Sequence, residues 1–341
     1  MTEQEVWQRL RLLESFDNVQ NWFKSIHNRE LNSRRTNEII CAAKQAREYF
    51  KNAKQSDYSV RSLLAFYGIA CLSRSVTLLL KENGGEETLT KGHGLEVHDW
   101  SATLSGEISQ AIAKIANLQV VTCSGLFNDF IESTENIHCL HLYSSGVDWV
   151  ISYGATKLGM KISFMELLSR IPDFENEIKM ISSGNYAAIN DISYQKDSEF
   201  KIGRIYEPHS SLVDYYGRKG YSITPLGRSN YTLTCPSEFF LKNKPLFLHN
   251  YTDKNFGSIP QLFLVKPLEC GVNYSEMGFC YLVSYFMGML SRYYPTHWLS
   301  LINGGKGDLM WPVINRAQNY VEKVFPELLL EFIQEILKKE K

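Results

Sequence analysis

The sequence lacks the features that mark most specialised classes of protein. It contains no C-x-x-C pair, although seven cysteines are scattered through its 341 residues. It also has no Pro-, Gly- or Ser-rich linker, no internal repeat and no low-complexity tract. A disulfide framework or a cysteine-based metal site is therefore not expected, and an odd number of thiols inside apolar runs is typical of a reducing compartment. Composition marks no domain boundary.

Neither an excess of charge nor a long apolar run is present. The 36 Lys and Arg residues nearly balance the 37 Asp and Glu residues, which argues against general attraction to nucleic acid or anionic lipid but allows a local basic face. The two most apolar stretches, Ser62–Ser73 and Met277–Ser291, are shorter than the roughly 20 residues that a membrane helix needs. The first residues are acidic and polar, unlike a signal peptide. We therefore expect a cytoplasmic protein that does not bind membranes.

Hydrophobic periodicity predicts helices at both ends of the chain. In Arg34–Lys54 the apolar residues recur on one helical face, whereas Tyr58–Lys81 is apolar nearly all round, as in a central core helix. Helices are predicted again near the C-terminus over Met277–Tyr293, Pro312–Phe325 and Pro326–Lys339. Pro326 suits the first position of the last of these helices.

The middle of the chain is rich in β-branched and aromatic residues between turn signals, which favours strands. Strands are predicted over Leu118–Cys123, Ile137–Tyr143, Phe200–Tyr206, Gly220–Thr224, Tyr231–Thr234 and Leu262–Val265. The predicted fold class is α+β, with a mainly helical core formed by both ends of the chain and a β-rich insert in the middle. The predicted parts are N-terminal helices (1–115), a mixed α/β insert (116–270) and C-terminal helices (271–341) that pack on the N-terminal ones.

Arg292 and His297 are the first candidates for chemistry. Pro295 favours the start of a new helix, so Arg292 should end one helix and His297 should lie in the first turn of the next. A guanidinium and an imidazole held across such a break can cleave RNA without a metal: His297 takes the 2′-hydroxyl proton and Arg292 stabilises the phosphorane. The structural alternative is that Arg292 caps helix carbonyls and His297 packs beside Trp298.

A basic stripe on one predicted helix is the second candidate. It consists of Lys44, Arg47, Lys51 and Lys54, with Arg34 and Arg35 at the start of the same helix. Cations in this arrangement can follow the phosphates of an RNA backbone. The alternative is a solvated helix face whose long side chains cover the edge of the core.

Histidine spacing gives no convincing metal site, and we expect no cofactor. His93, His98 and Asp99 include enough ligand types, but the intervening glycine discourages the helix that would align them. In the predicted strand, a spacing of three sends His138 and His141 to opposite faces. The sequence also has no nucleophile elbow, complete phosphate-binding loop or dinucleotide-binding fingerprint.

Several strings taken together resemble the bacterial YaaC-like proteins over nearly the whole chain. They are Arg34–Asn37, Gln45–Phe50, Val60–Gly68, Lys91–Leu95, Leu167–Asp173 and Ser291–Pro295. The resemblance implies kinship and brings no established activity with it. Arg61 and His93 lie within these strings, and we expect them to line a cleft.

A looser similarity is to the HEPN superfamily, helical domains of toxin and phage-defence systems. Many of its members are metal-independent ribonucleases with an R-x4-6-H pair at a dimer interface. Arg292 and His297 have this spacing, whereas Tyr293 and Pro295 depart from the usual motif. The similarity implies an RNA-directed endoribonuclease of a bacterial defence or toxin-type system, acting as a homo-oligomer on RNA or with a protein encoded nearby. The alternative is a non-catalytic interaction or scaffold subunit of a multiprotein complex.

Overall fold

The computed structural model describes residues 2–139, 150–227, 229–252 and 261–338. They form two compact units. Unit 1 comprises Met1–Ile137, Gly154–Met165 and Glu276–Lys341, and unit 2 comprises His138–Tyr153 and Glu166–Ser275. With 56% of the described residues in helices and 18% in strands, the fold is α+β with a helical core, as predicted. The predicted divisions at residues 116 and 271 stay a prediction.

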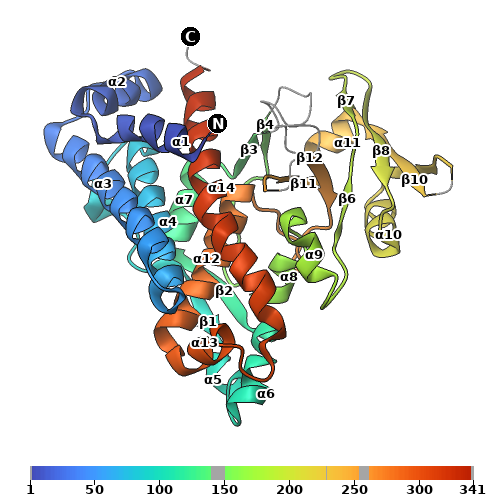
Figure 1. Ribbon diagram of the computed structural model, residues 1–341. Helices are drawn as coiled ribbons and strands as arrows, with labels where there is room; N and C mark the ends of the chain where they lie inside the picture. Colours follow the sequence, from blue (N-terminus) through green and yellow to red (C-terminus); the bar gives the residue numbers. More distant parts are fainter. Residues whose placement is uncertain (1, 140–149, 228, 253–260, 339–341) are drawn as a thin grey trace. The chain divides into compact units, whose positions relative to one another are not determined.

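Unit 1 is built on long helices from both ends of the chain (Figure 1). The N-terminal helices are α1 (Glu3–Leu10), α2 (Phe16–His27), α3 (Ser33–Gln55) and α4 (Tyr58–Leu80). Shorter helices follow: α5 (Trp100–Thr103), α6 (Ile108–Ile112) and α7 (Leu126–Ser133). The C-terminal helices are α12 (Glu276–Tyr293), α13 (Pro295–Ile302) and α14 (Trp311–Lys338). The predicted helices at Arg34–Lys54, Tyr58–Lys81 and Met277–Tyr293 are confirmed within two residues at each end.

Side-chain caps define where α3 and α4 begin. The Asn32 side chain accepts a hydrogen bond from the Arg35 amide at 2.9 Å, and the Asp57 carboxylate accepts one from the Ser59 amide at 2.8 Å. These bonds satisfy amides that a helix start leaves without partners. At 23 residues α4 is long and apolar enough to span a membrane, but 72% of its apolar window is buried. That degree of burial is expected of a core helix.

The core of unit 1 depends on a close approach between α4 and α12. A Cβ added at Gly288 of α12 would lie 2.9 Å from the Cβ of Phe66 in α4. Glycine therefore lets the two helices approach to a distance that any larger residue would prevent. Around this contact, Phe66 and Tyr285 pack edge to face with their ring centroids 5.5 Å apart.

The two helices predicted on either side of Pro326 are one helix, so this prediction is wrong. α14 runs from Trp311 to Lys338 with Pro326 in its interior. Proline removes one backbone hydrogen bond and usually ends a helix. Here the flanking residues Phe325 and Leu329 are fully buried, and their packing on both sides of the proline offsets the lost bond.

Unit 1 also contains a small antiparallel sheet that the sequence only partly predicted. Its strand order is β1 (His93–His98), β2 (Gln119–Gly125) and β5 (Lys161–Ser163). The predicted strand Leu118–Cys123 corresponds to β2, whereas β1 was not predicted. β1 pairs with β2 in a register that shifts between His93 and Leu95. The shift separates His93 from the regular part of the strand.

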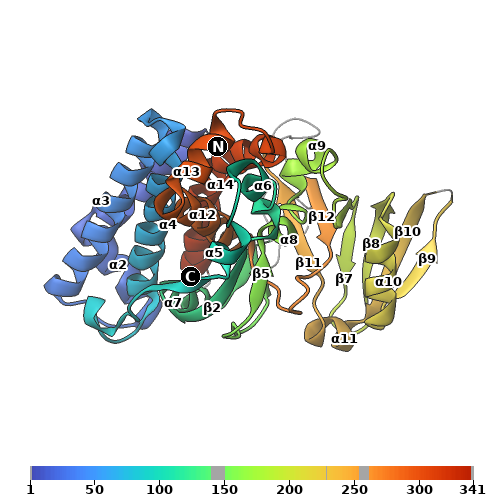
Figure 2. The same cartoon turned by 90° about the horizontal axis from the view of Figure 1, so that it is seen from below.

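Unit 2 contains the rest of the strands (Figure 2). One antiparallel sheet has the order β7 (Ile192–Tyr194), β8 (Glu199–Tyr206), β10 (Asn230–Pro236) and β9 (Ser222–Pro225). A second has the order β11 (Leu246–Asn250), β12 (Gln261–Val265) and β6 (Tyr186–Ala188). A ribbon pairs β3 (Ile137–Cys139) with β4 (Val150–Ser152). The short helices are α8 (Phe164–Leu168), at the boundary of the units, α9 (Glu175–Ile178), α10 (Ser210–Arg218) and α11 (Ser237–Lys242).

The aromatic and β-branched residues that predicted these strands form the core of unit 2. Phe200, Leu233 and Phe240 belong to one buried cluster, in which the rings of Phe200 and Phe240 stack at 4.1 Å. The strands predicted at Phe200–Tyr206, Gly220–Thr224, Tyr231–Thr234 and Leu262–Val265 are confirmed as β8, β9, β10 and β12. β3 confirms the first three residues of the predicted strand Ile137–Tyr143. Residues 140–143 lie outside the described residues.

Candidate functional site

The backbone of His93 is fixed by a glycine-rich junction at the start of β1. Both neighbours, Gly92 and Gly94, have positive φ angles, of 92° and 79°. A Cβ at Gly94 would lie 2.7 Å from the backbone nitrogen of Phe127, so no larger residue fits there. The hydroxyl of Tyr281 donates a hydrogen bond to the His93 carbonyl oxygen at 3.2 Å. The local sequence thus sets the position from which the imidazole projects.

The imidazole of His93 lies half-buried among aromatic rings of α4 and α12. Its centroid is 5.0 Å from that of Phe66, 6.1 Å from that of Tyr285 and 6.3 Å from that of Tyr67. Tyr67 in turn stacks on Tyr49 at 5.6 Å. Among the described residues, no group forms a hydrogen bond to a ring nitrogen of His93. The imidazole is held by packing, and its nitrogens remain able to bind another molecule.

Two exposed arginines accompany this imidazole. Arg292, in the last turn of α12, donates a hydrogen bond to the hydroxyl of Tyr67 at 2.6 Å, and its guanidinium lies 4.9 Å from the ring of Tyr293. Arg74 projects from α4. No carboxylate in the part of the chain that the structure describes forms an ion pair with either arginine. Their charges are therefore available to an anion.

These surroundings favour the neutral form of His93. Burial is the main cause that lowers its pKa below the ordinary value of 6.5, and the positive charges of Arg292 and then Arg74 lower it further. A neutral imidazole accepts a proton, and two guanidinium groups stabilise developing negative charge. We define His93, Tyr67, Arg74 and Arg292 as the candidate site.

His297 has a different environment from the one that the sequence motif suggested. Its Nε2 lies 3.0 Å from the carbonyl oxygen of Leu104, and its ring packs edge to face against Tyr294 at 5.8 Å. The charge of Arg292 acts on His93, which was predicted only as a cleft residue. Joint action of Arg292 and His297 on one phosphate stays a prediction.

Arg61, the other predicted cleft residue, joins two helices of unit 1. Its guanidinium forms a two-pronged ion pair with the carboxylate of Glu322 in α14, at 2.6 and 2.8 Å, and also donates to Asn319. The Glu322 side chain is 3% exposed and that of Arg61 15%. Arg61 therefore links α4 to α14 through this ion pair.

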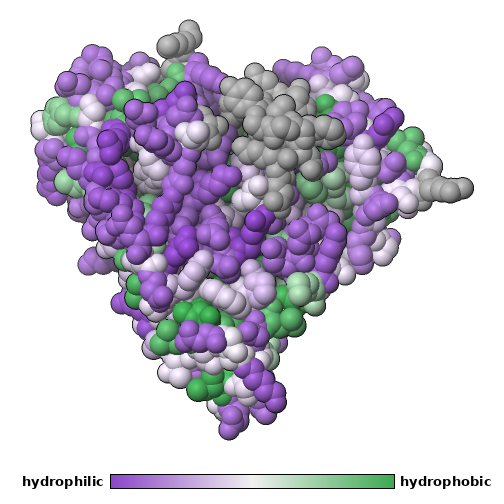
Figure 3. All heavy atoms as spheres, in the orientation of Figure 1, coloured by the Kyte–Doolittle hydropathy of each residue, from purple (hydrophilic) through white to green (hydrophobic). Residues whose placement is uncertain are grey.

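The basic stripe on α3 is partly neutralised by acidic neighbours. Arg47 pairs with Glu14 at 2.7 Å, and Lys54 pairs with Glu3. Lys44 and Lys51 are exposed, and neither forms an ion pair within the described ranges. Figure 3 shows mainly hydrophilic side chains over α3. Two of the four stripe residues therefore keep an uncompensated charge.

The arginines at the start of α3 have separate roles. Arg34 is exposed and pairs with Glu38 at 2.9 Å and Glu87 at 3.3 Å. Arg35 is buried and donates hydrogen bonds to carbonyl oxygens at the end of α4, including that of Leu78 at 2.7 Å. It caps a helix end from a distant part of the sequence.

The described histidines that the sequence offered as possible metal ligands lie in two different strands, β1 and β3. Within β1, His93 lies before the register shift and His98 lies in the regular part of the strand. His98 lies 3.2 Å from the carboxylate of Asp99. His141 lies outside the described residues. His138 lies beside His249, which comes from a strand far along the chain, so no spacing in the sequence indicates this pair.

The fold and this site define an α+β protein in which an imidazole of β1 and two arginines of α4 and α12 lie together in unit 1. The chain belongs to the YaaC-like family: the family model described as YaaC-like Protein matches residues 11–333. No curated protein and no solved structure matches the chain.

Proposed function

We propose that this YaaC-like protein is an RNA-directed, metal-independent endoribonuclease of a bacterial defence or toxin-type system, with His93 as its general base. The observation that carries the proposal is the half-buried, neutral imidazole of His93 beside Arg292 and Arg74. These groups meet the needs of RNA cleavage by transfer to the 2′-hydroxyl: a base for the nucleophile and positive charge for the phosphorane.

In this mechanism His93 removes the proton of a ribose 2′-hydroxyl, and the 2′-oxygen attacks the adjacent phosphorus. Arg292 and Arg74 stabilise the negative charge that develops on the non-bridging oxygens. The bond from phosphorus to the 5′-oxygen breaks, and that oxygen accepts a proton from solvent. The products are a 2′,3′-cyclic phosphate and a free 5′-hydroxyl, and His93 returns to its neutral form by releasing its proton to water.

Tyr67 positions the guanidinium of Arg292 in this mechanism. Its hydroxyl accepts the hydrogen bond from Arg292, and its ring is held by stacking on Tyr49. A guanidinium fixed in this way loses less conformational freedom when it binds a phosphate oxygen. All the side chains in this mechanism belong to unit 1.

Cleavage of a fluorescent single-stranded RNA by the full-length protein in EDTA tests the proposal. His93→Gln and Arg292→Ala should each lower the rate at least about 100-fold, the lower end of typical acid–base contributions. The matched controls are His98→Gln in the same strand and Arg11→Ala on the surface of unit 1, which should cleave at the wild-type rate. A wild-type rate in His93→Gln would overturn the mechanism. No cleavage by the wild type would favour a non-catalytic interaction subunit.

A further inference from the structure

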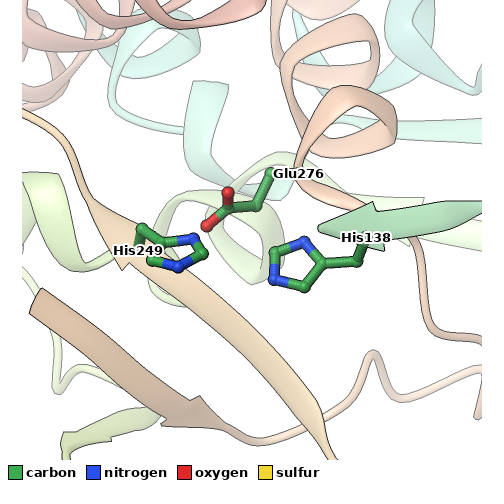
Figure 4. Close-up of side chains that lie close together, drawn as sticks. All are labelled: His138, His249 and Glu276. Atoms are coloured by element: carbon green, nitrogen blue, oxygen red, sulfur yellow. The ribbon is translucent and has the colours of Figure 1, made fainter. Parts of the chain in front are cut away.

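Unit 2 contains two buried histidines in contact, apart from the residues of the candidate site. His138 comes from β3 and His249 from β11, and they are 3% and 1% exposed. Their rings lie at an interplanar angle of 28° with centroids 5.4 Å apart (Figure 4). Glu276, which Figure 4 also labels, belongs to unit 1 as the first residue of α12.

The spacing of the two imidazoles suits a shared metal ion. Each ring offers one nitrogen, and these two nitrogens lie within 4.8 Å of each other. Zinc binds imidazole nitrogen at about 2.0–2.1 Å, so two ligand nitrogens of a tetrahedral site lie roughly 3.4 Å apart. That separation falls inside the 4.8 Å limit within which the two nitrogens lie. Imidazole is also a preferred ligand of copper and nickel, but not of magnesium or calcium.

The surroundings of His249 hold its ring in an orientation that suits a metal ligand. Its Nδ1 lies 3.3 Å from the hydroxyl of Tyr251, so an oxygen orients this nitrogen and Nε2 is the ring's second possible ligand atom. Metal-binding histidines usually donate their second N–H to a neighbouring oxygen in this way. The backbone after His249 is itself anchored, because the carboxylate of Asp173 accepts hydrogen bonds from the amides of Tyr251 at 3.0 Å and Thr252 at 2.6 Å.

We infer that His138 and His249 bind one transition-metal ion that favours imidazole, with Zn²⁺ as the probe. The two imidazoles supply two ligands, and water or other oxygen ligands would complete the coordination of the ion. The ion joins the ribbon of β3 and β4 to the sheet of β11, β12 and β6, so its role is to stabilise unit 2. It takes no part in the proposed RNA cleavage and does not depend on that proposal.

The test is Zn²⁺ titration of the full-length protein after treatment with EDTA and dialysis. One Zn²⁺ per chain should bind by calorimetry, and the thermal midpoint should rise on the order of 5 °C when free Zn²⁺ exceeds the dissociation constant about 100-fold. Mg²⁺ at the same concentration should not change the midpoint. Co²⁺ in place of Zn²⁺ should give a visible absorption band. A midpoint that does not respond to Zn²⁺, or a chain that binds none, overturns the inference.

Substitutions of His138 and His249 test whether this pair, rather than a cysteine elsewhere, binds the Zn²⁺. His138→Phe and His249→Phe keep an aromatic ring in the core but remove the ligand nitrogen, so each should lose the Zn²⁺-dependent rise in midpoint. His98→Gln in unit 1 should keep it. If either Phe variant binds Zn²⁺ as tightly as the wild type, the site lies elsewhere and the inference is wrong. If both fail to fold, the cobalt spectrum of the wild type decides: bands of imidazole coordination support the site and thiolate bands overturn it.

Discussion

Arg292 donates a hydrogen bond to the hydroxyl of Tyr67 at 2.6 Å, joining the end of α12 to the middle of α4. The two residues are far apart in the sequence, and their contact holds a guanidinium beside the ring of His93. If the bond positions Arg292 for catalysis, Tyr67→Phe should lower kcat about tenfold with little change in KM, because a hydrogen bond to a charged group contributes about 1.5–3 kcal/mol. Steady-state RNA cleavage measures both constants.

The control for that substitution is Tyr49→Phe. Tyr49 stacks on Tyr67 through its ring, and the change keeps the ring and removes only the hydroxyl. It should leave kcat unchanged. Equal effects of the two substitutions would mean that the tyrosine hydroxyls act on the packing of α3 and α4 rather than on Arg292.

The pKa of His93 provides a test that needs no substrate. Burial, Arg292 and Arg74 lower it, in that order of effect. Removing a positive charge makes protonation easier, so Arg292→Ala should raise the pKa of His93, and Arg74→Ala should raise it by less. NMR titration of the imidazole proton reports each value. A pKa that does not change in Arg292→Ala would show that the guanidinium does not act on His93.

The same shift makes the stability of unit 1 depend on pH. Because the folded-state pKa of His93 lies below the unfolded value of 6.5, protonation favours the unfolded chain. The stabilising contribution is complete above pH 6.5 and is lost as the pH falls through the folded pKa. His93→Gln should therefore weaken the loss of stability below pH 6.5, measured by urea unfolding at several pH values. The His98→Gln control should keep the wild-type dependence.

The buried ion pair between Arg61 and Glu322 gives a prediction on stability. Arg61→Ala leaves the Glu322 carboxylate buried without its cation, which should lower the free energy of unfolding by about 3–5 kcal/mol. Arg61→Met with Glu322→Met removes both charges and should recover most of that loss. Denaturant unfolding measures both variants. A single variant as stable as the wild type would indicate that Arg61 is free to line a cleft instead.

The sequence predicted the long helices well because their signal is local. The apolar face of α3 and the all-round apolar character of α4 are set by residues within a few turns. The predicted helix break at Pro326 was wrong because the rule that proline ends a helix is also local. It takes no account of the packing around Phe325 and Leu329. β1 was missed because Gly94 interrupts the strand-like pattern of His93–His98, and only its pairing with β2 makes it a strand.

The candidate site was predictable only in part, for a related reason. Arg292 and His93 were both selected from the sequence, but the motif joined Arg292 to His297, its neighbour along the chain. His93, whose pKa the charge of Arg292 lowers, comes from β1, far earlier in the chain. Nothing local distinguishes Tyr67 or Arg74 from other residues of an apolar helix, and the contact of His138 with His249 likewise arises from the tertiary fold.

The structure also refines the prediction for the basic stripe. Because Arg47 and Lys54 already pair with carboxylates, only Lys44 and Lys51 should release counterions from RNA. Lys44→Gln with Lys51→Gln should reduce the slope of log affinity against log salt by about 1.4 for a single strand. Arg47→Gln with Lys54→Gln should change it little. Filter binding at several salt concentrations measures the slopes, and equal slopes for both double variants would contradict this division.

The central claim is that His93, rather than His297, is the base that activates a 2′-hydroxyl. The most direct measurement is single-turnover cleavage of one RNA in EDTA by the wild type, His93→Gln and His297→Gln, with the product ends identified by phosphorus NMR. The account predicts 2′,3′-cyclic phosphate ends, a rate at least about 100-fold lower in His93→Gln and a wild-type rate in His297→Gln. Cleavage that survives in His93→Gln and is lost in His297→Gln, or products with 5′-phosphate ends, would contradict it.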